Sequence, residues 1–226
     1  MPRRAADWNL KPKLLIVELW GLGDLAIATP FLRAAAGKFA VTLLAKPFAR
    51  ELQPRLWPEV HVETFIAPWT AFKYKYRLWR WPLLGMDRVR RRLAEIHFDF
   101  GLSARWDPRD HLLLRAFGAQ SRLGFPRLGS RIFLTRPLAR PDPAAHRYES
   151  WRVLARALDL ELPPREKIFF PAAPRRETVL LHSGAGQPVR VWPLEKFRSL
   201  AAQLRENQFQ VQIACDPDQR HENAEE

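Results

Sequence analysis

The stretch VELWGLGDLAIATPFLRA, Val17–Ala34, decides the fold of the first part of this chain. It overlaps an apolar run, Lys13–Leu19, whose composition is typical of a parallel strand buried on both faces. Two glycines and a carboxylate, Asp24, follow, and apolar side chains then return at helical spacing. A strand that enters a helix through a glycine turn predicts an α/β domain, and such turns are where these domains bind ligands. Two interpretations of Asp24 stay open: a cap of the helix, or a group that takes part in chemistry.

The same kind of pattern continues along the chain and predicts one Rossmann-like domain over residues 1–160. Val41–Ala45 completes a β-α-β unit, Val60–Ile66 alternates as a third strand, and Phe98–Ala104 is a strand that leads into a charged loop. Glu149–Leu160 has the spacing of an amphipathic helix. Pro30 is expected to kink the first helix or to divide it into two pieces.

A proline-rich segment, residues 161–177, is expected to be a linker. After it, residues 178–226 open a second α/β unit. This unit consists of a strand at Thr178–His182, a glycine-containing loop, a helix that begins near Pro193, and an alternating strand, QVQIAC. Because roughly fifty residues are few for an independent core, we expect this second domain to be incomplete.

The composition restricts the class of protein. Apolar residues make up 47% of the 226 residues, which is enough for a core and argues against disorder. The single cysteine, Cys215, alternates with apolar residues, so we expect a small core side chain, no disulfide within the chain and a cytoplasmic protein. No apolar run has the length of a membrane span, and the N-terminus lacks the features of a signal peptide. The histidines show no metal-ligand spacing, so no metal site is predicted.

The charge points to an anionic partner. The formal net charge is +13 and the isoelectric point is near 10.8, which suits nucleic acid, an anionic membrane face or a phosphorylated substrate. Solvated surface arginines are the alternative explanation. The basic and aromatic stretch Phe72–Arg92 has the same three interpretations: a solvated helical face, a membrane-surface segment with Trp79 and Trp81 at the interface, or a nucleic-acid contact.

Two motifs together resemble glycosyltransferase family 9, the ADP-heptose:lipopolysaccharide heptosyltransferases. The first reads x-G-D, an apolar helix and T-P; it is matched here by Gly23, Asp24, Thr29 and Pro30. The second reads H-x-G-A-G, a basic residue, W-P, an acidic residue and F. Its matches are His182, Gly184, Ala185, Gly186, Arg190, Trp192, Pro193, Glu195 and Phe197.

The resemblance implies a GT-B architecture, with two Rossmann-like domains facing across a cleft, and an inverting transferase that needs no cofactor. It would move heptose or a related sugar from an ADP-heptose-like donor to a lipopolysaccharide-core or similar anionic glycolipid, at the cytoplasmic face of the inner membrane. Asp24 would be the catalytic base, and the N-terminal domain would bind the acceptor through Gly23, Arg105 and Arg109. The two arginines either hold acceptor phosphates or pair with Asp107 and Asp110.

The donor would lie on the C-terminal domain. A glycine loop before a helix offers backbone N–H groups and a helix dipole to a pyrophosphate, and an arginine offers a permanent cation. The resemblance therefore assigns donor binding to Ser183, Gly184, Ala185, Gly186 and Arg190. Arg190 stands where the family usually has lysine, which keeps the charge and alters the geometry.

The resemblance has one large departure. The family's later motif, D-x-G-x-x-H, does not occur in this sequence. We therefore expect the chain to be a fragment of a longer enzyme or an inactive copy. A catalytically inactive remnant that binds nucleotide or glycan is the first alternative function, and a basic nucleic-acid-binding protein is the second.

Overall fold

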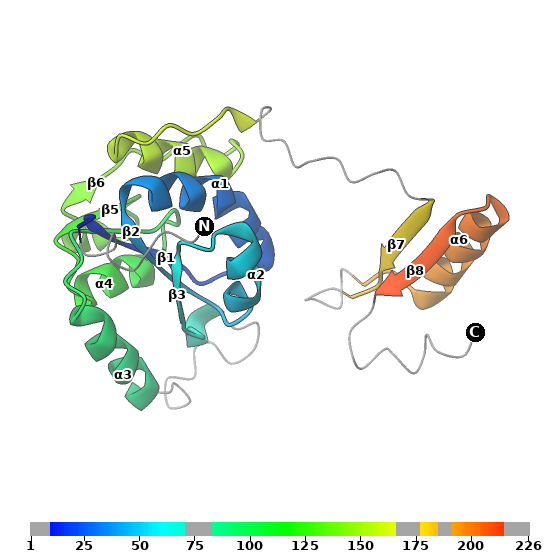
Figure 1. The fold of residues 1–226 in the computed structure, drawn as a ribbon, viewed down its shortest axis with the longest axis horizontal. Coiled ribbons are helices and arrows are strands. Elements are labelled where there is room, and N and C mark those ends of the chain that lie inside the picture. The colour runs from blue at the N-terminus through cyan, green and yellow to red at the C-terminus, as the bar shows by residue number, and fades with distance from the viewer. Residues whose placement is uncertain (1–9, 71–82, 166–176, 185–190, 215–226) are drawn as a thin grey trace. The chain divides into compact units, whose positions relative to one another are not determined.

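The computed structural model describes residues 10–70, 83–165, 177–184 and 191–214 of the chain. These residues belong to two units, Met1–Ile168 and Phe169–Glu226, and the boundary falls inside the proline-rich segment expected to be a linker. The first unit runs from blue to yellow-green in Figure 1, and the second from yellow to orange-red.

A six-stranded sheet forms the centre of the first unit, and every pair of neighbouring strands in it is parallel. The strand order is β3-β2-β1-β4-β5-β6. The strands are β1 (Lys13–Glu18), β2 (Ala40–Ala45), β3 (His61–Thr64), β4 (Phe100–Leu102), β5 (Ser121–Gly124) and β6 (Arg136–Pro137). Because the chain winds outward from β1 first in one direction and then in the other, the point between β1 and β4 is the topological switch where such sheets bind ligands.

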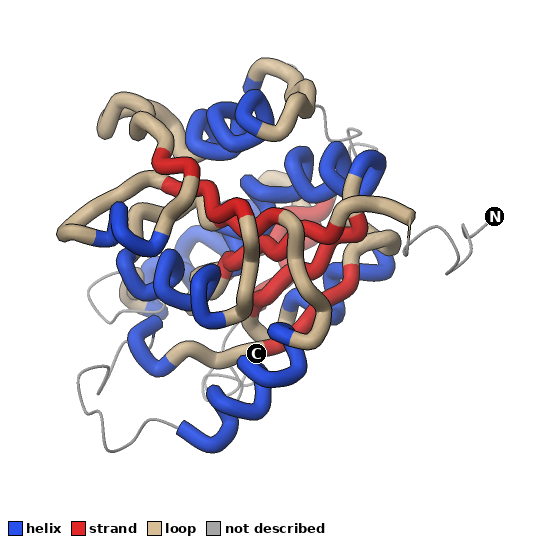
Figure 2. Tube along the Cα trace, turned by 90° about the vertical axis from the view of Figure 1, so that its left-hand side faces the viewer, coloured by secondary structure: helices blue, strands red, loops and turns tan. Residues whose placement is uncertain are grey.

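Helices cover both faces of this sheet, as Figures 1 and 2 show. One face carries α1 (Leu22–Lys38), α2 (Ala49–Leu56) and α5 (Tyr148–Ala157). The opposite face carries α3 (Leu83–Ala94) and α4 (Pro108–Ala116). Two 3-10 turns, η2 (Pro68–Thr70) and η4 (Ser130–Phe133), complete the described elements of this unit.

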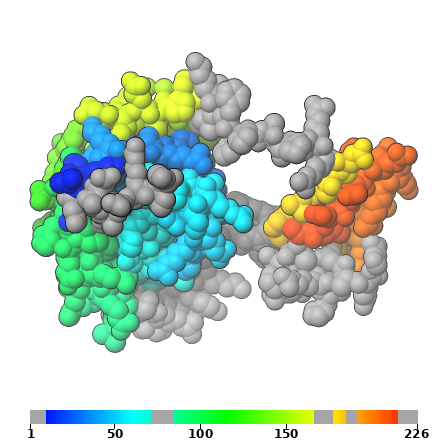
Figure 3. Space-filling view, viewed as in Figure 1, coloured from blue at the N-terminus to red at the C-terminus, as the bar shows by residue number. Residues whose placement is uncertain are grey.

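The apolar run that opens the chain explains this layering. Leu14 and Ile16 pack into the core under α1 and α5, whereas Leu15 and Val17 pack into the core under α3 and α4. All four side chains are fully buried, which is the pattern of a parallel strand covered on both faces. Each contributes about 1.5–3 kcal/mol of burial free energy. Figure 3 shows the blue and cyan N-terminal segments lying directly against green residues from the middle of the chain.

Two local expectations differ from the structure. Helix α1 runs as a single helix through Pro30 rather than as two pieces, because its apolar face, which includes Phe31 and Leu32, is packed into the core along its length. The charged loop after β4 is also shorter than expected. Asp107 caps α4 by accepting a hydrogen bond from the backbone N–H of Arg109 at 3.0 Å, so Arg109 and Asp110 lie in the helix.

The second unit contains a parallel β-α-β motif. Strand β7 (Thr178–His182) pairs with β8 (Gln210–Ala214), and α6 (Leu194–Glu206) connects them, with Pro193 immediately before the helix. The α/β class and the Rossmann-like character predicted from the sequence are confirmed. Ala185, Gly186, Arg190, Cys215 and residues 72–82 of the basic-aromatic stretch lie outside the described residues. Among the described helices, none combines the length and apolar character needed to cross a bilayer.

Candidate active site

The loops that follow β1 and β4 meet at the switch point of the first sheet. Because the two strands are parallel neighbours, their carboxyl ends lie at the same edge. The chain leaves β1 through Trp20 and Gly21 and enters α1 at Leu22. It leaves β4 through Ser103 and Arg105. Side chains separated by some eighty residues of sequence therefore reach one another here.

Asp24, in the first turn of α1, is the centre of these contacts. One carboxylate oxygen, Oδ2, accepts hydrogen bonds from the backbone N–H of Gly21 at 2.9 Å and from Nη2 of Arg105 at 2.8 Å. The other oxygen, Oδ1, accepts from Nη1 of Arg147 at 2.5 Å. The side chain retains 16% of its exposure. Asp24 thus satisfies a backbone donor at the helix start and also faces two cations, so the two interpretations drawn from the sequence do not exclude each other.

Arg105 is held on several sides. Its guanidinium lies over the ring of Trp20, 4.2 Å from the centroid, and its backbone N–H donates to the hydroxyl of Ser103 at 3.2 Å. Its Nε atom lies 3.9 Å from Oε1 of Glu18, and its Nη2 donates to Asp24. Only 21% of the side chain is exposed. This arginine therefore has a fixed position between two carboxyl groups.

Two buried carboxyl groups lie behind the arginines. Glu18, the last residue of β1, is 2% exposed, and burial raises its pKa from 4.5 to about 7 although the neighbouring Arg105 opposes the rise. Asp110 of α4 is fully buried, and burial together with the charges of Asp107 and Glu18 raises its pKa well above the usual range. The hydroxyl of Ser103 donates to Asp110 at 3.1 Å. A carboxyl group with a pKa near 7 changes charge in the physiological range.

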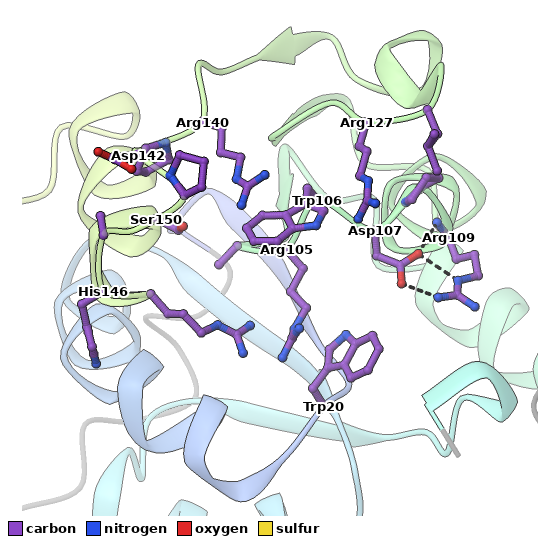
Figure 4. A pocket seen from close by; sticks show the side chains of 17 residues that line it. Trp20, Arg105, Trp106, Asp107, Arg109, Arg127, Arg140, Asp142, His146 and Ser150 are labelled. Atoms are coloured by element: carbon purple, nitrogen blue, oxygen red, sulfur yellow. Dashed lines mark hydrogen bonds and ion pairs between the residues drawn. The ribbon is translucent and has the colours of Figure 1, made fainter. Parts of the chain in front are cut away.

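A cavity of about 660 Å³ in the first unit opens beside these residues. Figure 4 shows side chains from the loop after β4, the segment after β5 and the start of α5 pointing into it. Its lining includes five arginines: Arg105, Arg109, Arg127, Arg140 and Arg147. Two carboxylates line it, and one of them, Asp107, is paired with Arg109 at 2.6 Å. The excess of cations makes the cavity suited to an anionic ligand.

Aromatic rings add a second kind of surface to the cavity. The guanidinium of Arg140 lies 3.3 Å from the ring centroid of Trp106, and Figure 4 shows the two stacked. Trp20 carries Arg105 in the same way on the opposite side of the cavity. Tryptophan faces and planar guanidinium groups suit a ligand with both apolar ring surfaces and charged groups. Within the described residues, no group of three histidine, cysteine or acidic side chains is arranged to hold a metal ion.

The structure brings several sequence-predicted residues together. Arg105 contacts Asp24 directly, and Gly23 precedes Asp24 in the first turn of α1. Arg109 lines the same cavity and pairs with Asp107, so this one of the suggested pairings is present. Asp110 is bonded to Ser103 instead.

Other residues of this site were missed by the sequence analysis. Arg147, Arg127 and Arg140 come from segments that carried no recognisable motif, and they reach the cavity only through the fold. Glu18 had a signal that could have identified it, because it is the only acidic residue in the otherwise apolar run that forms β1. A charged side chain at the end of a fully buried strand points to a site.

In the second unit, Ser183 and Gly184 follow β7 directly. Ser183 is 4% exposed, and its backbone N–H donates to the carbonyl of Ala214 at 3.0 Å, which extends the pairing of the two strands. The remaining residues assigned to donor binding, Ala185, Gly186 and Arg190, lie outside the described residues.

The fold and the site define a class: a doubly wound α/β domain with an arginine-lined cavity at its switch point, followed in the chain by a second β-α-β motif. The model of glycosyltransferase family 9 (heptosyltransferase) matches residues 86–226, more than half of the chain. The chain therefore belongs to glycosyltransferase family 9, a family of glycosyltransferase enzymes.

Several solved structures have the same fold. The E. coli heptosyltransferase WaaC, solved with ADP-2-deoxy-2-fluoro heptose, aligns with a TM-score of 0.70 and 16% identity over 92% of this chain and 71% of its own. E. coli ADP-heptose lps heptosyltransferase II aligns with a TM-score of 0.65 and 18% identity over 94% of this chain and 67% of its own. The family 9 glycosyl transferase of Veillonella parvula aligns with a TM-score of 0.66 and 16% identity, over 94% of this chain and 65% of its own. No curated protein sequence matches the chain.

Proposed function

We propose that this chain carries the acceptor side, and the beginning of the donor side, of an inverting glycosyltransferase that moves heptose or a related sugar from an ADP-sugar to an anionic lipopolysaccharide-core glycolipid. The observation that carries the proposal is the position of Asp24 at the switch point, in contact with two arginines that line the cavity. Membership of the family supports the reaction class.

In the proposed step, a hydroxyl oxygen of the acceptor attacks the anomeric carbon of the donor sugar. The bond from that carbon to the ADP oxygen breaks, and ADP leaves with the bonding electron pair. The proton of the attacking hydroxyl passes to the carboxylate of Asp24. Attack from the face opposite to the leaving group inverts the anomeric centre. Arg105 and Arg147 hold Asp24 at the edge of the cavity in which the acceptor would lie.

The acceptor class follows from the lining of the cavity. Five arginines face a ligand there, which favours phosphate or carboxylate groups on the acceptor. The cavity also has two tryptophans for sugar-ring faces. We assign acceptor binding to Arg105, Arg109 and the backbone around Gly23. A lipid-linked acceptor of this kind would be met at the cytoplasmic face of a membrane.

The donor would be bound by the second unit. We assign its pyrophosphate to the loop after β7, with Ser183, Gly184, Ala185 and Gly186 supplying backbone N–H groups and Arg190 a cation. WaaC was solved with ADP and with a fluorinated ADP-heptose, which supports a nucleotide-sugar donor. Residues 1–160 and 178–226 would thus be the acceptor-side and donor-side parts.

The test is a comparison of Asp24→Asn with the native chain in a transfer assay that measures ADP release from ADP-heptose in the presence of a lipopolysaccharide-core acceptor. Asparagine keeps the shape and removes the base, so kcat should fall about 10²–10⁴-fold. Asp159→Asn is the matched control, because this carboxylate is 92% exposed and its φ of 53° suits asparagine. The control should keep native turnover.

Calorimetry with ADP separates the proposed function from its alternatives. An active native chain whose Asp24→Asn variant turns over normally would remove Asp24 from catalysis. ADP binding without turnover by the native chain would indicate a nucleotide-binding remnant. Tight nucleic-acid binding with a steep salt dependence and no affinity for ADP would indicate the nucleic-acid alternative.

A further inference from the structure

Both oxygens of the carboxylate assigned as the base accept hydrogen bonds in this structure. Three donors occupy Asp24: the backbone N–H of Gly21, Nη2 of Arg105 and Nη1 of Arg147. Oδ2 receives two of them, and Oδ1 receives the third. A general base must accept a hydrogen bond from the hydroxyl that it deprotonates. An ionised carboxylate has about four lone-pair sites, so the position left for the acceptor hydroxyl is on Oδ1, beside the guanidinium of Arg147.

The two arginines differ in how firmly they are held. Arg105 is stacked on Trp20, lies next to the buried Glu18 and is 21% exposed. Arg147 is 45% exposed, and its side chain donates to Oδ1 of Asp24. Its backbone lies at the N-terminal end of α5, so the guanidinium can move without a shift of the helix. Arg147 is the one that can leave at low cost.

Arg147 also lines the cavity, so an alternative partner can reach it there. An anionic group in the cavity competes with Asp24 for the same guanidinium, since arginine pairs with phosphate and carboxylate alike. The charges around Asp24 favour keeping Arg105 in place when this happens, because the carboxylate of Glu18 also attracts Arg105. Lys46, which also interacts with Asp24, leaves a cation beside the carboxylate after Arg147 moves.

We propose that Arg147 is a positioning residue that an anionic group of the acceptor draws away from Asp24, which gives the acceptor hydroxyl wider access to Oδ1. The proposal rests on the assignment of Asp24 as the base. It makes the reaction selective for acceptors that carry a phosphate or carboxylate close to the attacking hydroxyl, because one guanidinium must reach both partners. A neutral glycan would leave Arg147 in contact with Oδ1.

Anion binding tests this release without any turnover. If an anion and Asp24 compete for Arg147, the anion weakens the Asp24–Arg147 ion pair by some factor. Linkage then requires that removing the charge of Asp24 strengthens anion binding by the same factor. We therefore expect Asp24→Asn in the full 226-residue chain to bind inorganic phosphate at least about fivefold more tightly than the native chain. The guanidinium NMR signal of Arg147 in the native chain should shift on phosphate titration, and that of Arg105 should stay.

A double-variant comparison separates release from a general electrostatic effect. In an Arg147→Gln background, Asp24→Asn should leave the phosphate affinity unchanged. In an Arg127→Gln background, which removes a cavity arginine without touching Asp24, the fivefold gain should persist. A gain that persists without Arg147, or equal phosphate shifts at both arginines, would overturn the proposal. Arg147→Lys provides the assignment of the NMR signal, and Arg147→Met is a second uncharged background if the glutamine variant does not fold.

The two proposals fail in different ways. If phosphate releases Arg147 but Asp24→Asn transfers sugar normally, the release is real and the assignment of the base is wrong. If Asp24→Asn abolishes transfer but phosphate leaves Arg147 in place, the base is correct and the release is wrong. In a transfer assay, the Arg147→Gln substitution should raise the KM for the anionic acceptor more than it lowers kcat. The variant lacks the guanidinium that binds the anionic group of the acceptor, while Oδ1 of Asp24 is already open.

Discussion

The Nε atom of Arg105 lies 3.9 Å from Oε1 of Glu18. A permanently charged guanidinium thus stands beside a carboxyl group that is 2% exposed and has a pKa near 7. The Nη2 atom of the same arginine lies 2.8 Å from Oδ2 of Asp24. The charge of Glu18 therefore depends on pH in the range where the protein works, and the contact that orients Asp24 is linked to it.

Glu18→Gln should make stability less dependent on pH. The pKa of Glu18 is raised from 4.5 in the unfolded chain to about 7 in the folded one, so the folded state binds the proton more tightly. The native protein then loses stability as the pH rises from about 4.5 through about 7. Glutamine has no proton to lose, so the variant should be more stable than the native chain at pH 8, by about 1–3 kcal/mol.

Urea titrations at pH 4.5 and pH 8 measure this difference. The two proteins should be closer in stability at the lower pH, where Glu18 is neutral in the folded state and half ionised in the unfolded chain. Glu59→Gln, at an exposed turn before β3, is a control that should show the pH dependence of the native chain. A Glu18→Gln variant that is less stable than the native chain at pH 8 would show that the ion pair outweighs burial.

Arg105 and Glu18 should be energetically coupled only where Glu18 is charged. We expect a double-variant cycle of Arg105→Gln and Glu18→Gln to give a coupling free energy of about 0.5–3 kcal/mol at pH 8. At pH 4.5 the coupling should be close to zero, since a neutral carboxyl group gains little from the cation. Equal coupling at both pH values would mean that the two side chains interact through packing rather than charge.

The first sheet could be predicted from the sequence because its signals are local. The buried run of β1, the glycine turn and the apolar face of α1 follow one another along the chain. Asp24 and Arg105 could be identified because each follows a predicted strand. The helical position of Arg109 was not predicted, because the cap that Asp107 provides was read as part of a loop.

The rest of the site could not be predicted because it depends on tertiary contacts. Arg147 meets Asp24 across 123 residues of sequence, from the start of a helix that looked merely amphipathic. The stacking of Arg140 on Trp106 likewise depends on how the segment after β6 folds back. Of the two expectations for Pro30, the division of α1 into two pieces is wrong, since packing outweighs the local cost of proline.

Gly124 should not tolerate a side chain, because it lies against the imidazole of His111. A Cβ at this position would be 2.8 Å from Nε2 of His111 and 3.3 Å from Cδ2 of Leu134. His111 is fully buried and is bonded through Nδ1 to the hydroxyl of Ser130 at 2.9 Å, so it has little room to move. Gly124→Ala should destabilise the first unit by about 1–3 kcal/mol in urea titrations.

Gly37→Ala is the matched control for this substitution. Gly37 lies near the end of α1, and a Cβ there would meet no atom within 4 Å. The control should be as stable as the native chain or more stable by about 0.4–1 kcal/mol, since alanine restricts the unfolded chain. If Gly124→Ala matched this control, His111 and the turn that carries Ser130 would have to shift freely.

Hydrogen exchange should differ sharply between the two units. In the first unit β1 is paired on both sides, by β2 and β4, and its Leu15 and Ile16 are fully buried. In the described part of the second unit, β7 pairs with β8 alone, and Leu180 on β7 remains 64% exposed. A two-stranded sheet opens at low free energy because few buried contacts hold it. The amide of Leu181 should therefore exchange at least about 100-fold faster than that of Ile16 at the same pH and temperature, corrected for intrinsic rates.

Exchange as slow as in β1 would mean that a further surface, such as a second chain, covers the β7–β8 sheet in solution. Repeating the measurement over a tenfold range of protein concentration would detect that second chain.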